Sequence, residues 1–402
     1  MPRNTIRFLF LNLGHFLDHF FVLIFATAAA LQLSTEWGMS YAELIPYATP
    51  GLVAFGLFSI PAGWLADKWS REGMMVIFFV GIGASSVLSS FAGTPLEIAI
   101  GLTLIGIFAA IYHPVGLAMV VQGRSKLGLP LAINGIFGNM GVASAALLTG
   151  ILIDTAGWRS AFLIPGIATI LLGIAYGLFE YTGGGKTETS ASAQTAKSAI
   201  SLPRNTLIRV FAIIFVTTAL GGMIFQSTTF ALPKVMDERL AGLADTASMV
   251  GWYTFVVFTI AAFAQLVAGH LVDHHSVRTV FAWISFLQVI FFTAMYQVTG
   301  VAALAVAICF MLVVFGAIPV KDVLVGRMAR SEWRSRAYAT SYIIGFTVSA
   351  LAVPVIAWIH GGWGFGMLFI VLAVIALLIT VGALLLPKSE PALQPATSSA
   401  SG

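Results

Sequence analysis

The sequence predicts an all-α membrane protein whose twelve transmembrane helices form two pseudo-symmetric six-helix bundles. Of its 402 residues, 59% are hydrophobic and only 9% are charged, whereas soluble chains carry about 25% charged residues. Apolar runs long enough to cross a bilayer follow one another along the whole chain. Short motifs of the first half also return in the second half at offsets of about 200 residues. A helical multi-span fold follows from the first two observations, and its division into two bundles follows from the third.

The hydropathy pattern predicts six spans in each half of the chain. In the first half they cover residues 6–32, 41–66, 73–93, 95–122, 130–154 and 159–180. In the second half they cover residues 207–235, 246–273, 277–299, 301–328, 334–360 and 364–387. The first run is longer than the roughly 7–15-residue apolar core of a signal peptide, so we expect it to remain as a span.

The distribution of lysine and arginine predicts that both termini are cytoplasmic. With the N-terminus inside, 16 of the 20 basic residues fall on the inner side. Only Arg159, Lys234 and Arg239 fall outside, and Lys321 lies within a span. This bias follows the positive-inside rule.

The internal repeat defines the expected domains. Gly63-Trp64-Leu65-Ala66-Asp67 after the second span is matched by Gly269-His270-Leu271-Val272-Asp273 after the eighth, and Pro2-Arg3-Asn4-Thr5 is matched by Pro203-Arg204-Asn205-Thr206. We expect an N-terminal bundle over 1–181, a cytoplasmic linker over 182–205, a C-terminal bundle over 206–387 and a disordered cytoplasmic tail over 388–402. The linker and tail are rich in Gly, Ser, Thr and Ala, which is typical of flexible segments.

The first span carries an unusual ionisable cluster. His15 and His19 are one helical turn apart, and Asp18 lies at i+3 from His15, so the three side chains share one face. Asp18 falls about 18 Å along a helix that starts at Ile6, near the middle of the bilayer. Ionisable residues at that depth typically mark a substrate or proton pathway. Asp18 is our candidate for carrying a coupling proton, with His15 and His19 as alternatives. A purely structural polar contact between helices is the other interpretation.

The loop after the second span resembles the signature of the major facilitator superfamily. In GWLADKWSRE the matching positions are Gly63, Leu65, Asp67, Lys68 and Arg71, and in the second copy Gly269, Leu271, Asp273 and Arg278. Ser70 and Ser276 replace the usual second glycine. The resemblance implies that these loops gate the conformational change, and we expect Lys68 and Arg71 to pair with cytoplasmic acids such as Glu332. Solvated charges that only set the topology are the alternative.

Several segments are similar to the fosmidomycin-resistance branch of efflux carriers. They are GHFLDH in the first span, Tyr41-Ala42-Glu43-Leu44, Ile111-Tyr112-His113-Pro114 and Asn134-Gly135-Ile136-Phe137-Gly138-Asn139. This resemblance implies export of a small polar compound in exchange for protons. Tyr112 and Asn139 are expected to bind that compound.

By resemblance to the superfamily, the first, fourth, seventh and tenth spans line a central cavity. The sequence agrees, because these spans carry His113, Lys321, Asp322 and Gln226 in addition to the first-span cluster. A gapless alignment of the halves places His113 opposite Lys321. We expect the two to face each other and to bind an anionic solute. Alternatively, Lys321 pairs with a carboxylate such as Asp18.

We therefore expect a multi-pass transporter of a bacterial-type cytoplasmic membrane that exports a small, anionic organic compound by proton antiport. Its partners are the solute, protons and lipid; it needs no cofactor or nucleic acid, is not an enzyme, and works as a monomer by resemblance to the superfamily. Uptake of an organic anion by proton symport is the first alternative. A carrier of a divalent metal or metal chelate is the second, with His15, Asp18, His19 and His113 as ligands.

Overall fold

The computed structural model describes residues 2–124, 128–182, 204–328, 345 and 348–387, and helices make up nearly all of this part of the chain. Eleven of the described helical segments are long and apolar enough to cross a membrane. The predicted all-α membrane architecture is therefore confirmed. The predicted linker and tail fall almost entirely outside the described residues.

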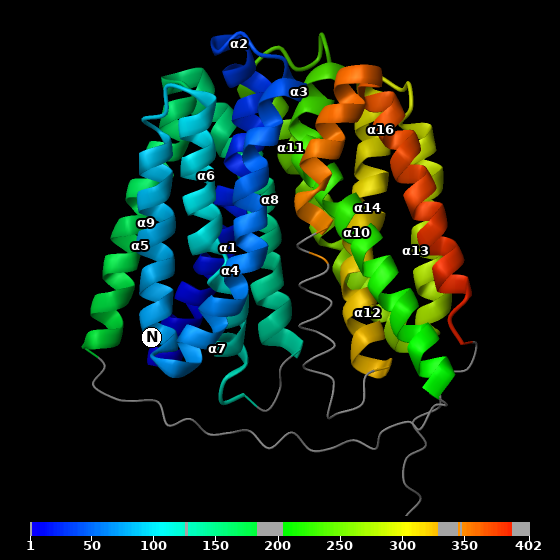
Figure 1. Ribbon diagram of the computed structural model, residues 1–402, viewed down its shortest axis with the longest axis horizontal. Coiled ribbons are helices and arrows are strands. Elements are labelled where there is room, and N and C mark those ends of the chain that lie inside the picture. Colours follow the sequence, from blue (N-terminus) through cyan, green and yellow to red (C-terminus); the bar gives the residue numbers. More distant parts are fainter. Residues whose placement is uncertain (1, 125–127, 183–203, 329–344, 346–347, 388–402) are drawn as a thin grey trace, which may run out of the picture.

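The helices of the first half lie together on one side of the molecule (Figure 1). In chain order they are α1 (Arg3–Ala28) with its continuation η1 (Ala29–Leu33) and α2 (Ser34–Glu36), α3 (Tyr41–Leu44), η2 (Ile45–Ala48), α4 (Thr49–Lys68), α5 (Arg71–Ser89), α6 (Pro95–Ala109), η3 (Tyr112–Gly116), α7 (Leu117–Val121), α8 (Gly128–Ala156) and α9 (Trp158–Tyr181).

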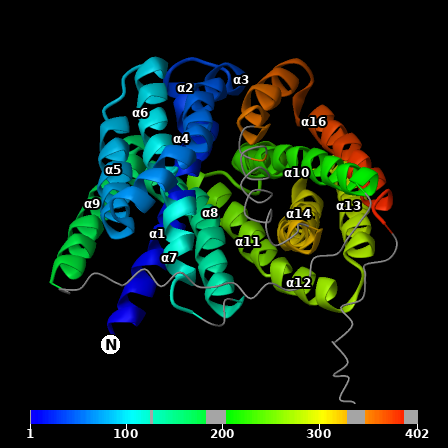
Figure 2. The same ribbon diagram turned by 60° about the horizontal axis from the view of Figure 1, so that its bottom comes forward.

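The helices of the second half lie on the other side, as the turned view also shows (Figure 2). They are α10 (Arg204–Arg239), α11 (Ala247–Ala262), α12 (Ala264–His274), α13 (Val277–Ala294), α14 (Gly300–Met328) and α16 (Ala352–Leu384).

Equivalent helices of the two halves begin with the same serine N-cap. The Ser70 hydroxyl accepts a hydrogen bond from the backbone N–H of Gly73 at the start of α5. The Ser276 hydroxyl accepts one from Thr279 at the start of α13. Serine satisfies an otherwise unpaired donor in a helical first turn. This shared cap explains why serine stands in both copies of the loop.

The fourth span is interrupted beside the ionisable cluster. Between α6 and α7 the chain forms the wide π-helical segment η3, which contains Pro114. Proline has no N–H for the helical ladder and its ring clashes with the preceding turn, and π-helical segments often occur at functional positions. The interruption lies where α4 approaches, since a Cβ on Gly63 would lie 3.2 Å from Cβ of Pro114.

The last described helix, α16, contains a break. Gly364 has φ of 74°, a non-helical conformation that glycine adopts easily, and the chain turns there. The segment after the break corresponds to the predicted twelfth span. About half of the predicted eleventh span, 334–360, lies outside the described residues, so twelve spans remain a prediction.

Contacts between the halves gather at the ends of the helices far from the N-terminus. There α8 packs against α11, and a Cβ on Gly251 would lie 2.7 Å from the carbonyl oxygen of Ala146. Tyr41 of α3 also stacks edge-on against His360 of α16, with ring centroids 5.4 Å apart. Glycine and alanine allow this close approach of helices.

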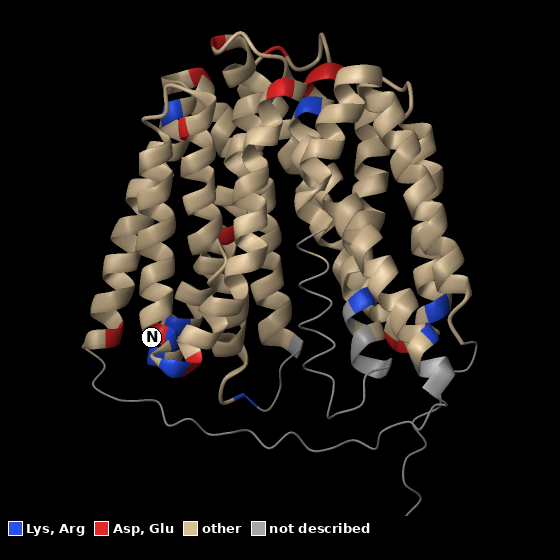
Figure 3. Cartoon of the chain, viewed as in Figure 1, with Lys and Arg blue, Asp and Glu red and all other residues tan. Residues whose placement is uncertain are grey.

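Most of the charged residues lie at the ends of the helices. Figure 3 shows most of the lysine, arginine, aspartate and glutamate residues at the two ends of the bundles, and one acidic position in the middle of the first half. At the end near the N-terminus, Arg7 pairs with Glu180 of α9. This pattern is expected of helices whose middle parts lie in hydrocarbon.

Candidate functional site

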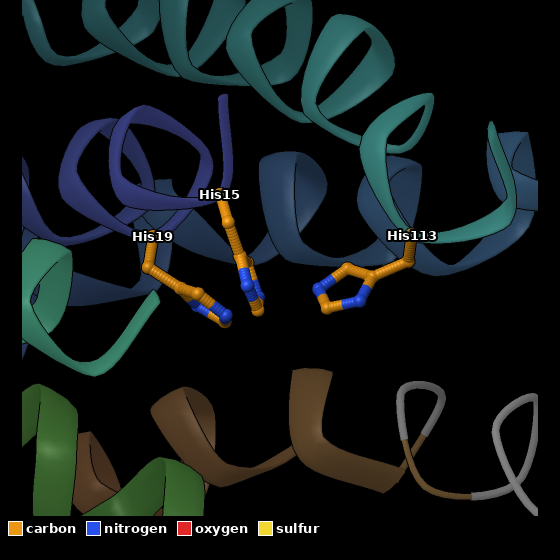
Figure 4. Close-up of side chains that lie close together, drawn as sticks. All are labelled: His15, His19 and His113. Atoms are coloured by element: carbon orange, nitrogen blue, oxygen red, sulfur yellow. The ribbon is translucent and has the colours of Figure 1, made fainter. Parts of the chain in front are cut away.

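Three histidines converge within the N-terminal half. His15 and His19 of α1 point toward His113 of η3 (Figure 4). The ring centroid of His113 lies 5.5 Å from each of the other two, and candidate ligating nitrogens of all three lie within 4.8 Å of one another. The predicted cluster on one face of the first span is thus joined by the histidine of the fourth.

Asp18 lies fully buried beside these histidines. Its Oδ2 atom is 3.3 Å from Nε2 of His113, and its side chain is 0% exposed. Removing an ionised carboxylate from water costs several kcal/mol unless a cation or a proton compensates for it. His113 is therefore a candidate countercharge for Asp18.

His15 is held in one orientation by α8. Its Nδ1–H donates to the backbone carbonyl of Asn134 at 2.8 Å, which fixes the tautomer and leaves Nε2 as the acceptor. Gly138 faces the imidazole so closely that a Cβ there would lie 2.7 Å from two ring atoms. The His15 ring also stacks on Tyr112, with ring centroids 4.9 Å apart. His15 is 8% exposed, and its Nε2 has no hydrogen-bond partner among the described residues.

A buried hydrogen-bond network supports this arrangement. The Tyr112 hydroxyl donates to the carbonyl of Leu11 at 2.8 Å, and the Asn134 amide donates to both Tyr112 and Asn12. Tyr112 is 0% exposed. Tyr112 connects the α1, η3 and α8 segments, and its predicted contact with the solute remains a prediction. Asn12 and the Asn134 side chain were not predicted, although asparagines in apolar spans are a signal for contacts between helices.

The remaining candidate residues lie in α14, α10 and α8. Lys321 of α14 lines a small cavity with Gly221 of α10 and with residues of α13. Gln226 of α10 is half-buried, and its amide nitrogen has no hydrogen-bond partner among the described residues. Asn139 of α8 is half-buried, and the Asp322 side chain lies outside the described part. That His113 and Lys321 face each other remains a prediction.

The loop residues form contacts within their own halves. Arg71 pairs with Asp67 at 2.8 Å, and the Arg278 guanidinium donates to the carbonyl of Leu384 at 2.7 Å. Lys68 and Asp273 are exposed. The expected partner Glu332 lies outside the described residues, so the predicted contact between the halves remains a prediction.

The chain belongs to the Major Facilitator Superfamily, whose family description matches residues 11–247 and 240–401. This establishes the family that the loop motif suggested.

Curated relatives include transporters of aromatic acids. The chain is 25% identical to the 4-hydroxybenzoate transporter PcaK of Pseudomonas putida over 395 residues, which covers 88% of this chain and 86% of that protein. It is 28% identical to the gallate transporter of Pseudomonas putida over 145 residues, or 36% of this chain and 32% of that protein. These names do not point specifically to a fosmidomycin-resistance branch, so that narrower resemblance remains a prediction.

Solved structures share the fold. A bacterial homologue of the human lysosomal transporter Spinster, in an inward-facing unoccupied conformation, matches with a TM-score of 0.74 and 13% identity over 96% of this chain and 97% of that one. A D-xylose-proton symporter matches with a TM-score of 0.72 and 13% identity over 94% of this chain and 97% of that one.

Proposed function

We propose that this chain is a proton-coupled transporter of a small organic acid, which works by alternating access between two six-helix bundles. Family membership supports transport, and the relatives named for gallate and 4-hydroxybenzoate support a carboxylate as the solute. The observation that carries proton coupling is the fully buried Asp18 beside His113.

Proton coupling follows from the surroundings of Asp18. A buried carboxylate is neutral when it binds a proton and needs a nearby cation when it does not. His113, with His15 and His19 behind it, can accept or return a proton over a short distance. A site that changes protonation as access alternates couples solute movement to the proton gradient.

The direction that we propose is export by antiport, which the resemblance of GHFLDH and the histidine of the fourth span to efflux carriers supports. Uptake by proton symport is the alternative. In the proposed topology both termini are cytoplasmic, twelve spans form bundles over 1–181 and 206–387, and the loops with Asp67 and Asp273 gate the change of state.

A second candidate is a carrier of a divalent metal or its chelate. The three convergent imidazoles favour it, because imidazole suits several transition ions. Such a carrier would move solute only in the presence of the ion, and a chelator would abolish transport.

The test is proton flux in proteoliposomes with a trapped pH dye, as 4-hydroxybenzoate or gallate is added. Wild type should move protons with the acid, and Asp18→Asn should reduce the flux to that of protein-free liposomes, because asparagine keeps the shape but cannot bind the proton. Asp245→Asn, at an exposed position between α10 and α11, is the control and should behave as wild type.

The direction of proton movement relative to the acid gradient separates symport from antiport. Equal proton flux in wild type and Asp18→Asn would make Asp18 a structural contact and contradict its coupling role. If proton flux appears only when a divalent ion is added, the organic-acid substrate is wrong and the metal carrier is supported.

A further inference from the structure

A small polar cavity lies inside the C-terminal half, between α10, α13, α14 and α16. It encloses about 40 Å³, room for about three waters. Its polar lining comes from Thr217, Ser285, Gln288 and Lys321, and Gly221 lies at its wall. A space of this size is too small for a whole organic solute, but it can hold one head group.

The hydroxyl of Ser285 needs a partner that the described protein does not supply. Ser285 is 1% exposed, and its Oγ has no hydrogen-bond partner among the described residues. Gln288 is 3% exposed and donates its amide to the carbonyl of Val313 at 3.2 Å. A buried polar group without a partner costs free energy, so the Ser285 hydroxyl indicates a bound water or ligand.

The other half of the molecule shows that packing does not require polar residues here. The loop motif and its serine caps align α5 with α13 without a gap, which places Phe79 at the position of Ser285 and Ile82 at that of Gln288. Both are 0% exposed core residues. The equivalent helix position in the N-terminal half is therefore filled with apolar side chains.

The first helix of each half shows the same difference. The Pro-Arg-Asn-Thr motifs at the starts of α1 and α10 align Phe20 with Gly221. Phe20 is 1% exposed, whereas Gly221 leaves space into which Lys321 extends, with Nζ 3.8 Å from where a Cβ would lie. Large apolar residues in one half thus correspond to small or polar residues around a cavity in the other.

We propose that this cavity binds the carboxylate group of the solute, with Lys321, Ser285 and Gln288 as its binding residues. The Lys321 ammonium supplies positive charge, and the Ser285 hydroxyl can donate to a carboxylate oxygen. Phe225 and Phe281 line the same cavity, so the apolar part of an aromatic acid next to the head group can contact aromatic rings. This inference rests on the proposed organic-acid substrate and adds residues of α13 to the site.

The test measures equilibrium binding of radiolabelled 4-hydroxybenzoate and gallate to detergent-purified protein, with the uncharged methyl esters as competitors. Ser285→Ala should weaken binding about tenfold or more, as expected for the loss of a hydrogen bond to a charged group. Lys321→Gln should reduce binding further. Ser85→Ala, which removes a hydroxyl bonded within α5, is the matched control and should bind as wild type.

A second variant fills the space without removing a polar group. In Gly221→Ala the new methyl would meet Lys321 at ordinary contact distance, 3.7 Å from its Cδ, so the fold is preserved while the cavity shrinks. Gly177→Ala in α9 adds the same methyl at 3.6 Å from Val76 of α5 and serves as its control. Weaker binding in Gly221→Ala but not in Gly177→Ala supports the subsite.

Failure of the carboxylate subsite and failure of the proposed function give different results. If wild type binds the acids and Ser285→Ala, Lys321→Gln and Gly221→Ala bind them equally well, the cavity holds only water, and the subsite is wrong while the proposed function stands. If wild type binds neither acid, or the methyl esters compete as well as the acids, the carboxylate substrate and the subsite are wrong together.

Discussion

The contact of Asp154 with α11 gives a quantitative prediction about the conformational equilibrium. Asp154, near the end of α8, accepts hydrogen bonds from the backbone N–H groups of Ala247 and Ser248 at 3.2 and 2.7 Å, and from the Ser248 hydroxyl. Thr246 caps the same helix by accepting from Met249. The carboxylate thus joins the two halves at a helix N-terminus, where negative charge is favourable.

The free energy of this contact can be approximated from its exposure. Asp154 is exposed, so each of its three hydrogen bonds contributes roughly 0.5–1 kcal/mol rather than the 1.5–3 kcal/mol of a buried charged pair. Their loss in Asp154→Ala should disfavour the present conformation by about 1.5–3 kcal/mol, or about 10–150-fold in population. Ser248→Ala removes only the hydroxyl bond and should shift the population a few-fold.

The assay is a spin-label distance measurement across the two halves at this end of the helices. Labels at Leu96→Cys and Val301→Cys, both exposed, report the separation in a Cys309→Ser background. Asp154→Ala should add a longer-distance population, and Asp245→Ala should not. If Asp154→Ala leaves the distance distribution unchanged, the contact does not hold the halves together and the reasoning fails.

Two further predictions concern the surroundings of His15. In Gly138→Ala the new methyl would overlap the His15 ring, which should lower the melting temperature by several degrees and slow transport, as overpacking costs about 1–3 kcal/mol. Gly135→Ala, with nothing within 4 Å of its Cβ, should be neutral or stabilising, and equal behaviour of the two variants would contradict the packing argument. Tyr112→Phe should cost about 1–3 kcal/mol of stability, measured by thermal unfolding, because it removes the hydrogen bond that Tyr112 donates to Leu11 and the one that it accepts from Asn134. Loss of solute binding without loss of stability would support the predicted contact of Tyr112 with the solute.

The sequence was informative about what each helix carries and less so about which helices meet. Hydropathy and charge identified the spans, because hydrocarbon requires long apolar helices whatever their neighbours are. Helical periodicity also placed His15, Asp18 and His19 on one face. In contrast, the contact of Asp18 with His113 depends on how α1 and η3 are rotated and spaced.

The buried network around Asn134 shows why the sequence does not predict contacts between particular helices. The span containing Asn134 is apolar around most of its circumference, so no amphipathic stripe fixes its orientation. The sequence therefore does not indicate which helix faces the glycines of this span. The structure places Gly138 against His15 of α1, and Gly141 against the carbonyl of Phe16.

The internal repeat supplies information that hydropathy alone cannot. Ser285 and Gln288 in α13 resemble the scattered polar residues of any span, and nothing in their local sequence sets them apart. In register with α5 they replace the core residues Phe79 and Ile82, at positions buried in both halves. Since both halves must pack the same fold, a buried position that is apolar in one half and polar in the other is not explained by packing. Such positions are where a repeated fold can differ in function, which is why we place the carboxylate subsite in the second half.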